Sequence, residues 1–155
     1  MKNDEEFIKL KYSLILPVLF VFLLWIIKII DVSDSLNLFY YGVFPRETKG
    51  LYGIILSPLI HSDFNHLISN SFPLLILGTG IIFFYRDLAY RVIGFIWFVR
   101  GIGVWVGSRE SYHIGASGLI YGLAAFLFLS GLIRKDVRLA SISLLVVFLY
   151  GGLVW

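Results

Sequence analysis

Five apolar runs dominate this sequence, and each is close to the length that a helix needs to cross a membrane. They span roughly residues 12–30, 64–84, 89–107, 117–132 and 138–155. Crossing about 30 Å of hydrocarbon takes about 20 helical residues. The chain is 59% hydrophobic and 15% charged, whereas an ordinary soluble domain is about 45–50% apolar and about 25% charged. The sequence therefore predicts an all-α, polytopic membrane protein and excludes a disordered or soluble chain.

Lysine and arginine residues around the runs predict the orientation. One side carries Lys2, Lys9, Lys11, Arg86, Arg91, Arg134, Lys135 and Arg138, and the other carries Arg46, Lys49 and Arg109. Basic residues stay on the cytoplasmic side, so we expect a cytoplasmic N-terminus. The connections 31–63 and 108–116 then lie outside, and the second and fourth runs begin at the outer leaflet. The first run is too long for a signal peptide and reads as a retained anchor.

The sequence gives little support to other classes of function. The chain has no cysteine and three histidines, so a metal site is barely possible. No nucleotide-binding loop is visible. Its net charge of +3 is explained by topology rather than by nucleic acid. We therefore expect no cofactor, no metal and no nucleic-acid partner, with the lipid bilayer as the surroundings.

Polar residues open the second run, where hydrocarbon should exclude them. His66 and Asn70 are four residues apart, so on a helix they share one face about one turn apart. Such a pair serves interhelical hydrogen bonding more often than catalysis. Asp63 is most simply the N-cap of this helix. Both the bonding and the catalytic interpretation stay open for His66 and Asn70.

A serine between glycines opens the fourth run. Ser117 can be a simple N-cap, but Gly115 and Gly118 remove side chains near its hydroxyl and leave room for a substrate backbone. The helix N-terminus also offers amide donors to a developing negative charge. The predicted topology brings Ser117 to the depth of His66 and Asn70. A serine nucleophile with imidazole and amide donors nearby favours acyl transfer, such as peptide or ester hydrolysis.

These residues resemble those of the rhomboid family of intramembrane serine proteases. The likeness is carried by His61, His66 and Asn70 at the second run and by Gly115, Ala116, Ser117, Gly118 and Tyr121 at the fourth. It extends to five spans in the family's order, from about residue 12 to the chain end. It implies a single rhomboid-like transmembrane domain over residues 1–155 that cleaves single-pass membrane-protein substrates within the bilayer. The bacterial members that it resembles imply a bacterial inner membrane as its location.

The resemblance also implies a role for each matched residue. Ser117 would be the nucleophile, and His66, Asn70 and the Ser117 amide would form the oxyanion hole. Tyr121 would match the tyrosine that packs on the catalytic histidine, although it could simply be core. His61 would support structure or water access near the outer mouth, with the connection 31–63 partly embedded in the leaflet. The family's Trp-Arg pair is absent there, so Arg46 receives no role.

One departure concerns the general base, which the family carries on a sixth span. The fifth run reaches Trp155 with no polar stop, so we expect a chain truncated before that helix, with five spans of six. His113 lies in a connection and has no such role in the family. Lys28 could form a Ser-Lys pair but more often a lysine at a helix end snorkels to the interface. An inactive rhomboid-like protein that binds transmembrane segments is the alternative.

Two further features concern helix packing. Gly103 with Gly107, and Gly118 with Gly122, are spaced four apart, which predicts close approach of helices. Arg100 falls inside the third run with no acidic residue at comparable depth, and the family usually has a small residue there. Such an arginine lines a cavity or reaches backbone carbonyls.

Overall fold

The computed structural model describes residues 2–150. Six α-helices are present in this part: α1 (Lys2–Ser33), α2 (Gly53–Leu56), α3 (Phe64–Tyr85), α4 (Asp87–Gly107), α5 (Ser117–Arg134) and α6 (Val137–Tyr150). Three short 3₁₀ helices lie in the connection between α1 and α3: η1 (Leu38–Tyr41), η2 (Thr48–Gly50) and η3 (Ser57–Leu59). Within the described residues, extended pairing is limited to an isolated bridge between Val43 and His113.

Four helices are long and apolar enough to cross a membrane, namely α1, α3, α4 and α5. The fifth predicted span is a shorter apolar helix, α6, over Val137–Tyr150, and the predicted residues 151–155 lie outside the described part. The prediction of an all-α polytopic membrane protein is confirmed. Helix α1 starts ten residues before the predicted span, because hydropathy does not detect its polar first turns.

Helix α3 lies at the centre of the bundle and packs on α1, α4, α5 and α6. In its apolar window 61% of residues are buried, against 17% for α4. Its core side chains meet those of α1 and α5 in one apolar cluster that includes Leu24, Leu67, Leu74, Leu77, Ile81, Leu123 and Leu127. The residues at the start of α3 are therefore held by the best-packed element of the molecule.

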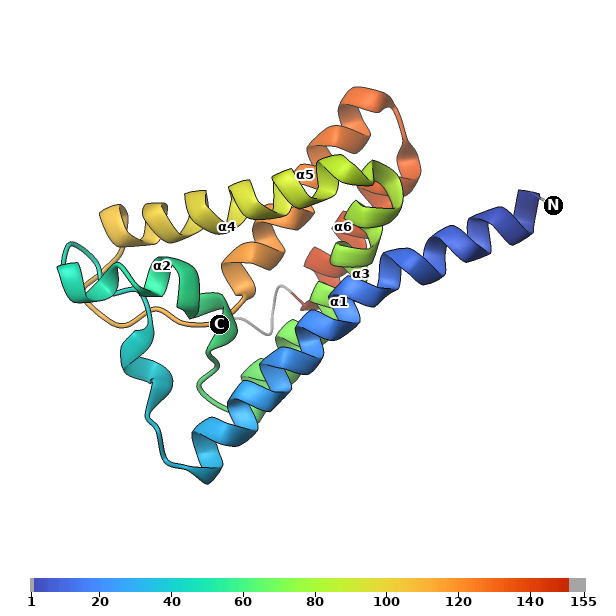
Figure 1. Ribbon diagram of the computed structural model, residues 1–155. Helices are drawn as coiled ribbons and strands as arrows, with labels where there is room; N and C mark the ends of the chain where they lie inside the picture. Colours follow the sequence, from blue (N-terminus) through green and yellow to red (C-terminus); the bar gives the residue numbers. More distant parts are fainter. Residues whose placement is uncertain (1, 151–155) are drawn as a thin grey trace.

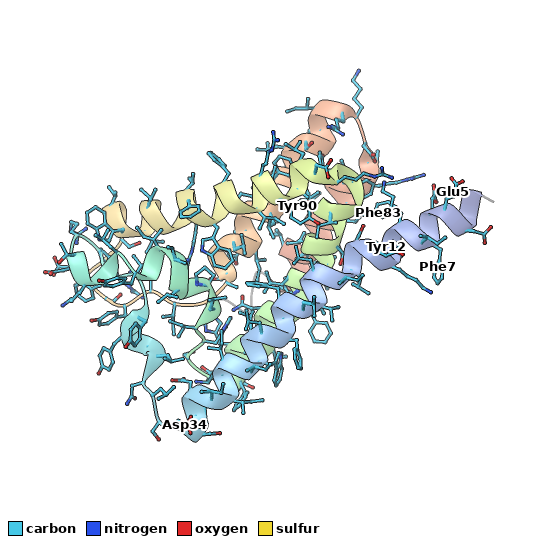
Figure 2. The ribbon with its side chains drawn as sticks, in the orientation of Figure 1. Glu5, Phe7, Tyr12, Asp34, Phe83 and Tyr90 are labelled. Atoms are coloured by element: carbon cyan, nitrogen blue, oxygen red, sulfur yellow. The ribbon has the colours of Figure 1, made fainter. Side chains whose placement is uncertain are left out.

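The connections divide between two ends of the bundle (Figure 1). The N-terminal part of α1 and the α3–α4 and α5–α6 turns lie toward one end, and the segments 34–63 and 108–116 lie toward the other. Glu5 near the start of α1 and Asp34 just after its end lie far apart, on opposite sides of the bundle (Figure 2). Because α3 and α5 both begin at the end with the long connections, their first turns are neighbours, as the sequence predicts.

The glycine pairs differ from each other. A Cβ on Gly122 would overlap the Ile96 side chain, and a Cβ on Gly118 would meet Arg100, so close α4–α5 packing at this pair is confirmed. A Cβ on Gly103 or Gly107 would have no neighbour within 4 Å. The prediction is wrong for that pair, because no described helix covers this face of α4.

The connection between α1 and α3 is fastened to α4. The Trp97 Nε1 atom donates to the Ile55 carbonyl at 3.1 Å, and the Trp105 Nε1 atom donates to the Glu47 carbonyl at 3.0 Å. Arg46 Nη1 donates to the Ser108 carbonyl at 3.0 Å. Helix α2 also packs on α4. These bonds anchor the connection above the start of α3 and α5.

Candidate active site

The first turn of α3 is organised by Asp63. Its Oδ1 atom accepts the His66 backbone N–H at 2.8 Å, so the predicted N-cap is confirmed. The Ser62 hydroxyl donates to Asp63 Oδ2 at 2.7 Å and also lies 3.2 Å from His66 Nδ1. Hydrogen bonds from the His66 amide and from Ser62 hold the pKa of the Asp63 carboxyl below its usual value. Ser62 thus links the capping carboxylate to the imidazole of His66.

The side chain of His61 packs against the imidazole ring of His66. Its side chain is 2% exposed, and the two imidazole rings meet edge to face with centroids 5.0 Å apart. Neither ring nitrogen of His61 has a hydrogen-bond partner among the described residues. Burial lowers the pKa of His61 to about 4, so the ring is neutral at pH 7. Its contacts fit the supporting role that the resemblance implies.

Asn70 lies one turn deeper in α3 on the same side. It is 2% exposed, and its Nδ2 atom has no partner within the part of the chain that the structure describes. Leaving a buried amide donor unpaired costs about 1–3 kcal/mol. Its donor is therefore available to a group that enters the site.

The imidazole of His66 and the amide of Asn70 converge on Gly115. A Cβ on Gly115 would lie 2.6 Å from His66 Cε1, 2.7 Å from His66 Nε2 and 3.8 Å from Asn70 Nδ2. Gly115 has φ of 99°, a conformation that only glycine adopts without strain. Its N–H donates to the Ser57 carbonyl at 2.8 Å. Position 115 therefore requires glycine both for its backbone angle and for the space that His66 occupies.

Ser117 is the first residue of α5, two positions after Gly115. The N-cap is Ala116, and no side chain caps this helix, so the interpretation of Ser117 as a simple N-cap is wrong. Ser117 lines a small cavity between α3, α5 and α6 that is completed by Ser69, Asn70, Pro73, Ile120, Tyr121, Val146, Val147 and Tyr150. Within residues 2–150, no hydrogen bond of the Ser117 hydroxyl is recorded. The serine, Asn70 and Tyr121 thus share one cavity.

Gly118 has a different use from the predicted one. A Cβ there would lie 2.7 Å from Arg100 Nε, so the missing side chain makes room for the arginine of α4. We expected Gly118 to leave space around the serine hydroxyl. The space that it leaves is filled by Arg100.

Arg100 reaches the backbone carbonyl of Gly115. Of the two alternatives that the sequence leaves open for this arginine, a cavity lining or a bond to backbone carbonyls, the structure shows the second. Its Nη2 atom donates to that carbonyl at 3.1 Å, and its Nη1 atom donates to Ser57 Oγ at 2.6 Å. The Nε atom is buried without a partner among the described residues. An arginine at this depth costs about 2.5–3.5 kcal/mol on insertion scales. The two hydrogen bonds offset part of that cost.

Two other basic candidates are used elsewhere. Lys28 is 6% exposed and donates to Asp31 Oδ2 and to the Ser62 carbonyl, both at 3.0 Å. The ammonium group of Lys28 reaches toward the end of α1, where it pairs with Asp31 one turn later, so it is not free to form a Ser-Lys pair with Ser117. His113 lies in a connection as predicted, and its Nε2 atom is 3.0 Å from the Arg109 carbonyl. These contacts leave both residues with structural roles.

Sequence analysis missed two serines at the site. Ser62 adjoins His66 only because the turn before α3 folds back, and Ser57 meets Arg100 and Gly115 through tertiary contacts. The stretch from His61 to His66 offers a signal for Ser62, since a hydroxyl next to a capping aspartate often completes the turn. No local pattern marks Ser57.

The fold and this cluster define a polytopic helical membrane protein with polar residues gathered at one end of its bundle. A family model described as the Rhomboid domain matches residues 48–155. The chain therefore belongs to the rhomboid family.

Several mycobacterial proteins are similar to this chain. It is 39% identical over 141 residues to uncharacterized proteins of Mycobacterium tuberculosis and Mycobacterium bovis, which covers 87% of this chain and 59% of theirs. It is 34% identical over 142 residues to an uncharacterized protein of Mycobacterium leprae, covering 87% of this chain and 56% of that one. The chain thus spans less than two thirds of these relatives. No solved structure matches it.

Proposed function

We propose that this protein is an intramembrane serine endopeptidase that cleaves transmembrane segments of single-pass membrane proteins. The observation that carries the proposal is the convergence of His66 and Asn70 on Gly115, two residues before Ser117. A nucleophile at a helix start with imidazole and amide donors beside it suits acyl transfer. Membership of the rhomboid family supports the same reaction class.

In the proposed reaction, Ser117 Oγ attacks the carbonyl carbon of the scissile peptide bond. The hydroxyl proton passes to a general base, which the family resemblance places on a sixth span. The carbonyl oxygen becomes an oxyanion that accepts hydrogen bonds from His66, Asn70 and the Ser117 amide. The leaving amine takes the proton, and water then hydrolyses the acyl-enzyme. Tyr121 lines the same cavity, which suits packing against the base.

The proposed orientation places this site near the outer leaflet of a bacterial cell membrane, with a cytoplasmic N-terminus. The basic residues support it, because they gather at the end of the bundle that carries the α3–α4 and α5–α6 turns. Substrates would then enter from the bilayer and be cut where water reaches the cavity.

The test replaces Ser117 with alanine in the full-length protein and follows cleavage of a model transmembrane substrate in proteoliposomes. We expect Ser117→Ala to abolish cleavage without changing expression or thermal stability. Ser69→Ala is the matched control: it lines the same cavity, but its hydroxyl is bonded to the Asn65 carbonyl at 2.7 Å, so activity should persist. Cleavage that survives Ser117→Ala would sink the assignment.

The second candidate function is binding of transmembrane segments without cleavage. The unbonded Ser117 hydroxyl in residues 2–150 is compatible with it. If the protein only binds transmembrane segments, the wild type should not react with a serine-directed phosphonate. The Ser117→Ala variant should then bind a transmembrane segment as tightly as the wild type. The gathering of three polar groups at Ser117, His66 and Asn70, of which Asn70 is fully buried, favours the protease, since a binder gains nothing from their convergence.

A further inference from the structure

The side chain of Arg100 contacts the backbone on both sides of Ser117. Its Nη2 atom donates at 3.1 Å to the carbonyl of Gly115, two residues before the serine. A Cβ on Gly118, the next residue after the serine, would lie 2.7 Å from Arg100 Nε and 2.8 Å from Arg100 Cγ. The arginine thus lies along the whole turn that carries Ser117.

Ser57 completes a closed set of three contacts with Arg100 and Gly115. Arg100 Nη1 donates to Ser57 Oγ at 2.6 Å, and the Gly115 N–H donates to the Ser57 carbonyl at 2.8 Å. Both backbone polar groups of Gly115 are therefore fixed, one by Ser57 and one by Arg100. A glycine has few steric restraints of its own, so these bonds determine where its peptide groups point.

Fixing the Gly115 carbonyl also fixes the next amide. In a trans peptide the carbonyl and the following N–H point in opposite directions, and the described chain contains no cis peptide. With its carbonyl held toward α4, Gly115 directs the Ala116 N–H away from Arg100. The start of α5, and with it Ser117, takes its orientation from this peptide plane.

A simple tether between α4 and the connection would not need Arg100. Trp97 and Trp105 of α4 already donate to the carbonyls of Ile55 and Glu47. Within residues 2–150, neither indole N–H bonds to Gly115 or Gly118. Within residues 2–150 no carboxylate forms an ion pair with Arg100, so its charge is directed at Ser57 and the Gly115 carbonyl.

We propose that Arg100 is a positioning residue, which holds the Gly115–Gly118 turn so that Ser117 keeps a fixed place beside His66 and Asn70. This inference rests on the proposed function of Ser117. Arg100 touches no reacting atom and acts through the backbone of Gly115. Losing it leaves substrate binding intact but misplaces the nucleophile, which lowers kcat while KM stays close to its original value.

The test uses the full-length protein with the variants Arg100→Met, Arg100→Lys and Ser57→Ala. Cleavage of a transmembrane peptide gives kcat and KM, and the rate of labelling by a fluorophosphonate reports Ser117 directly. A misplacement of about 1 Å costs about 100-fold, so we expect Arg100→Met to lower kcat and the labelling rate by about 10- to 100-fold. KM should change by less than about twofold, since the binding surface is unaltered.

The other variants separate positioning from general stability. Arg100→Lys keeps the charge and one hydrogen bond, so it should recover part of the lost rate, and Ser57→Ala keeps the Gly115 contact and should lose only a few-fold. Trp97→Phe is the matched control on α4, because it removes the bond to Ile55 while a smaller aromatic ring stays against Phe20; kcat should stay at the wild-type value. If Arg100→Met fails to fold, Arg100→Lys and Ser57→Ala carry the test.

The outcomes distinguish this inference from the proposed function. A wild-type protein that neither cleaves nor is labelled overturns both. Labelling of the wild type together with unchanged kcat in Arg100→Met, or in Arg100→Lys and Ser57→Ala, overturns the role of Arg100 alone. An equal loss in Trp97→Phe and Arg100→Met also overturns it, because the arginine would then act only as one of several tethers.

Discussion

At the scale of single residues, the site depends on a few close contacts between the starts of α3 and α5. The N-cap Asp63 and the shared face of His66 and Asn70 could be predicted from spacing, because capping and helical periodicity are local. The contacts of Ser57 with Arg100, and of Lys28 with Ser62, could not be predicted. They join residues far apart in the sequence.

Replacing Gly115 tests the tight approach of His66. Gly115→Ala should lower both thermal stability and cleavage, because its φ of 99° is strained for alanine and the Cβ would lie 2.6 Å from His66 Cε1. Strain of this kind costs about 1–3 kcal/mol. Gly103→Ala is the control, since nothing lies within 4 Å of its Cβ. Equal melting temperatures for the two variants would contradict the proposed packing.

His61 should make stability depend on pH. Its folded pKa of about 4 lies below the 6.5 of a free imidazole, so between these values the unfolded chain binds more protons. Stability is therefore complete above about pH 6.5 and falls as the pH drops to about 4, by about 3 kcal/mol. Unfolding in detergent micelles at pH 7 and 4.5 measures this. In the His61→Phe variant, the free energy of unfolding should differ less between the two pH values. An equal pH dependence in the variant and the wild type would show that His61 is not the titrating group.

At the scale of elements, hydropathy predicts the helices and misses their ends. The apolar runs match α1, α3, α4 and α5, because a membrane span is set by local composition. The start of α1 at Lys2 was missed: 32 helical residues are about 48 Å long, more than the bilayer core requires. The sequence predicts one connection over residues 31–63, whereas α1 continues to Ser33 and short helices follow it. These short helices form because tertiary bonds to α4 hold them.

The contacts of Lys28 with Asp31 and with the Ser62 carbonyl join α1 to the segment before α3, and we expect them to stabilise the fold. Lys28→Met removes the bonds to Asp31 and to the Ser62 carbonyl and leaves the Asp31 carboxylate, which is 14% exposed, without its cation. Breaking a fully buried pair from one side costs about 3–5 kcal/mol, and the cost here is smaller because water still reaches Asp31. The melting temperature should drop clearly, and the double variant Lys28→Met with Asp31→Leu should recover much of the loss. A single variant as stable as the wild type would show that the pair contributes nothing.

At the scale of the whole molecule, the bundle has one basic end and one end with the site. The N-terminal part of α1 and the two turns expected in the cytoplasm lie toward one end, opposite the segments 34–63 and 108–116 (Figure 1). Successive spans cross the membrane in opposite directions, so their connections alternate between its two sides. This division could therefore be predicted from the sequence. The relative tilt of the helices could not, because it is set by side-chain packing such as that of Ile96 on Gly122.

The absence of cysteine from the sequence allows a clean test of orientation. Lys135→Cys in the α5–α6 turn and Lys49→Cys in the long connection each introduce a single thiol. An impermeant maleimide added to intact cells should label position 49 and leave position 135 unlabelled until the membrane is opened. The reverse pattern would invert the topology.

The most direct test of the central claim is mass spectrometry of the full-length protein after reaction with a fluorophosphonate in membranes. The account predicts one adduct, located on Ser117, and no adduct in Ser117→Ala. An unmodified Ser117 under conditions that label a known serine hydrolase, or an adduct on another serine, would contradict it.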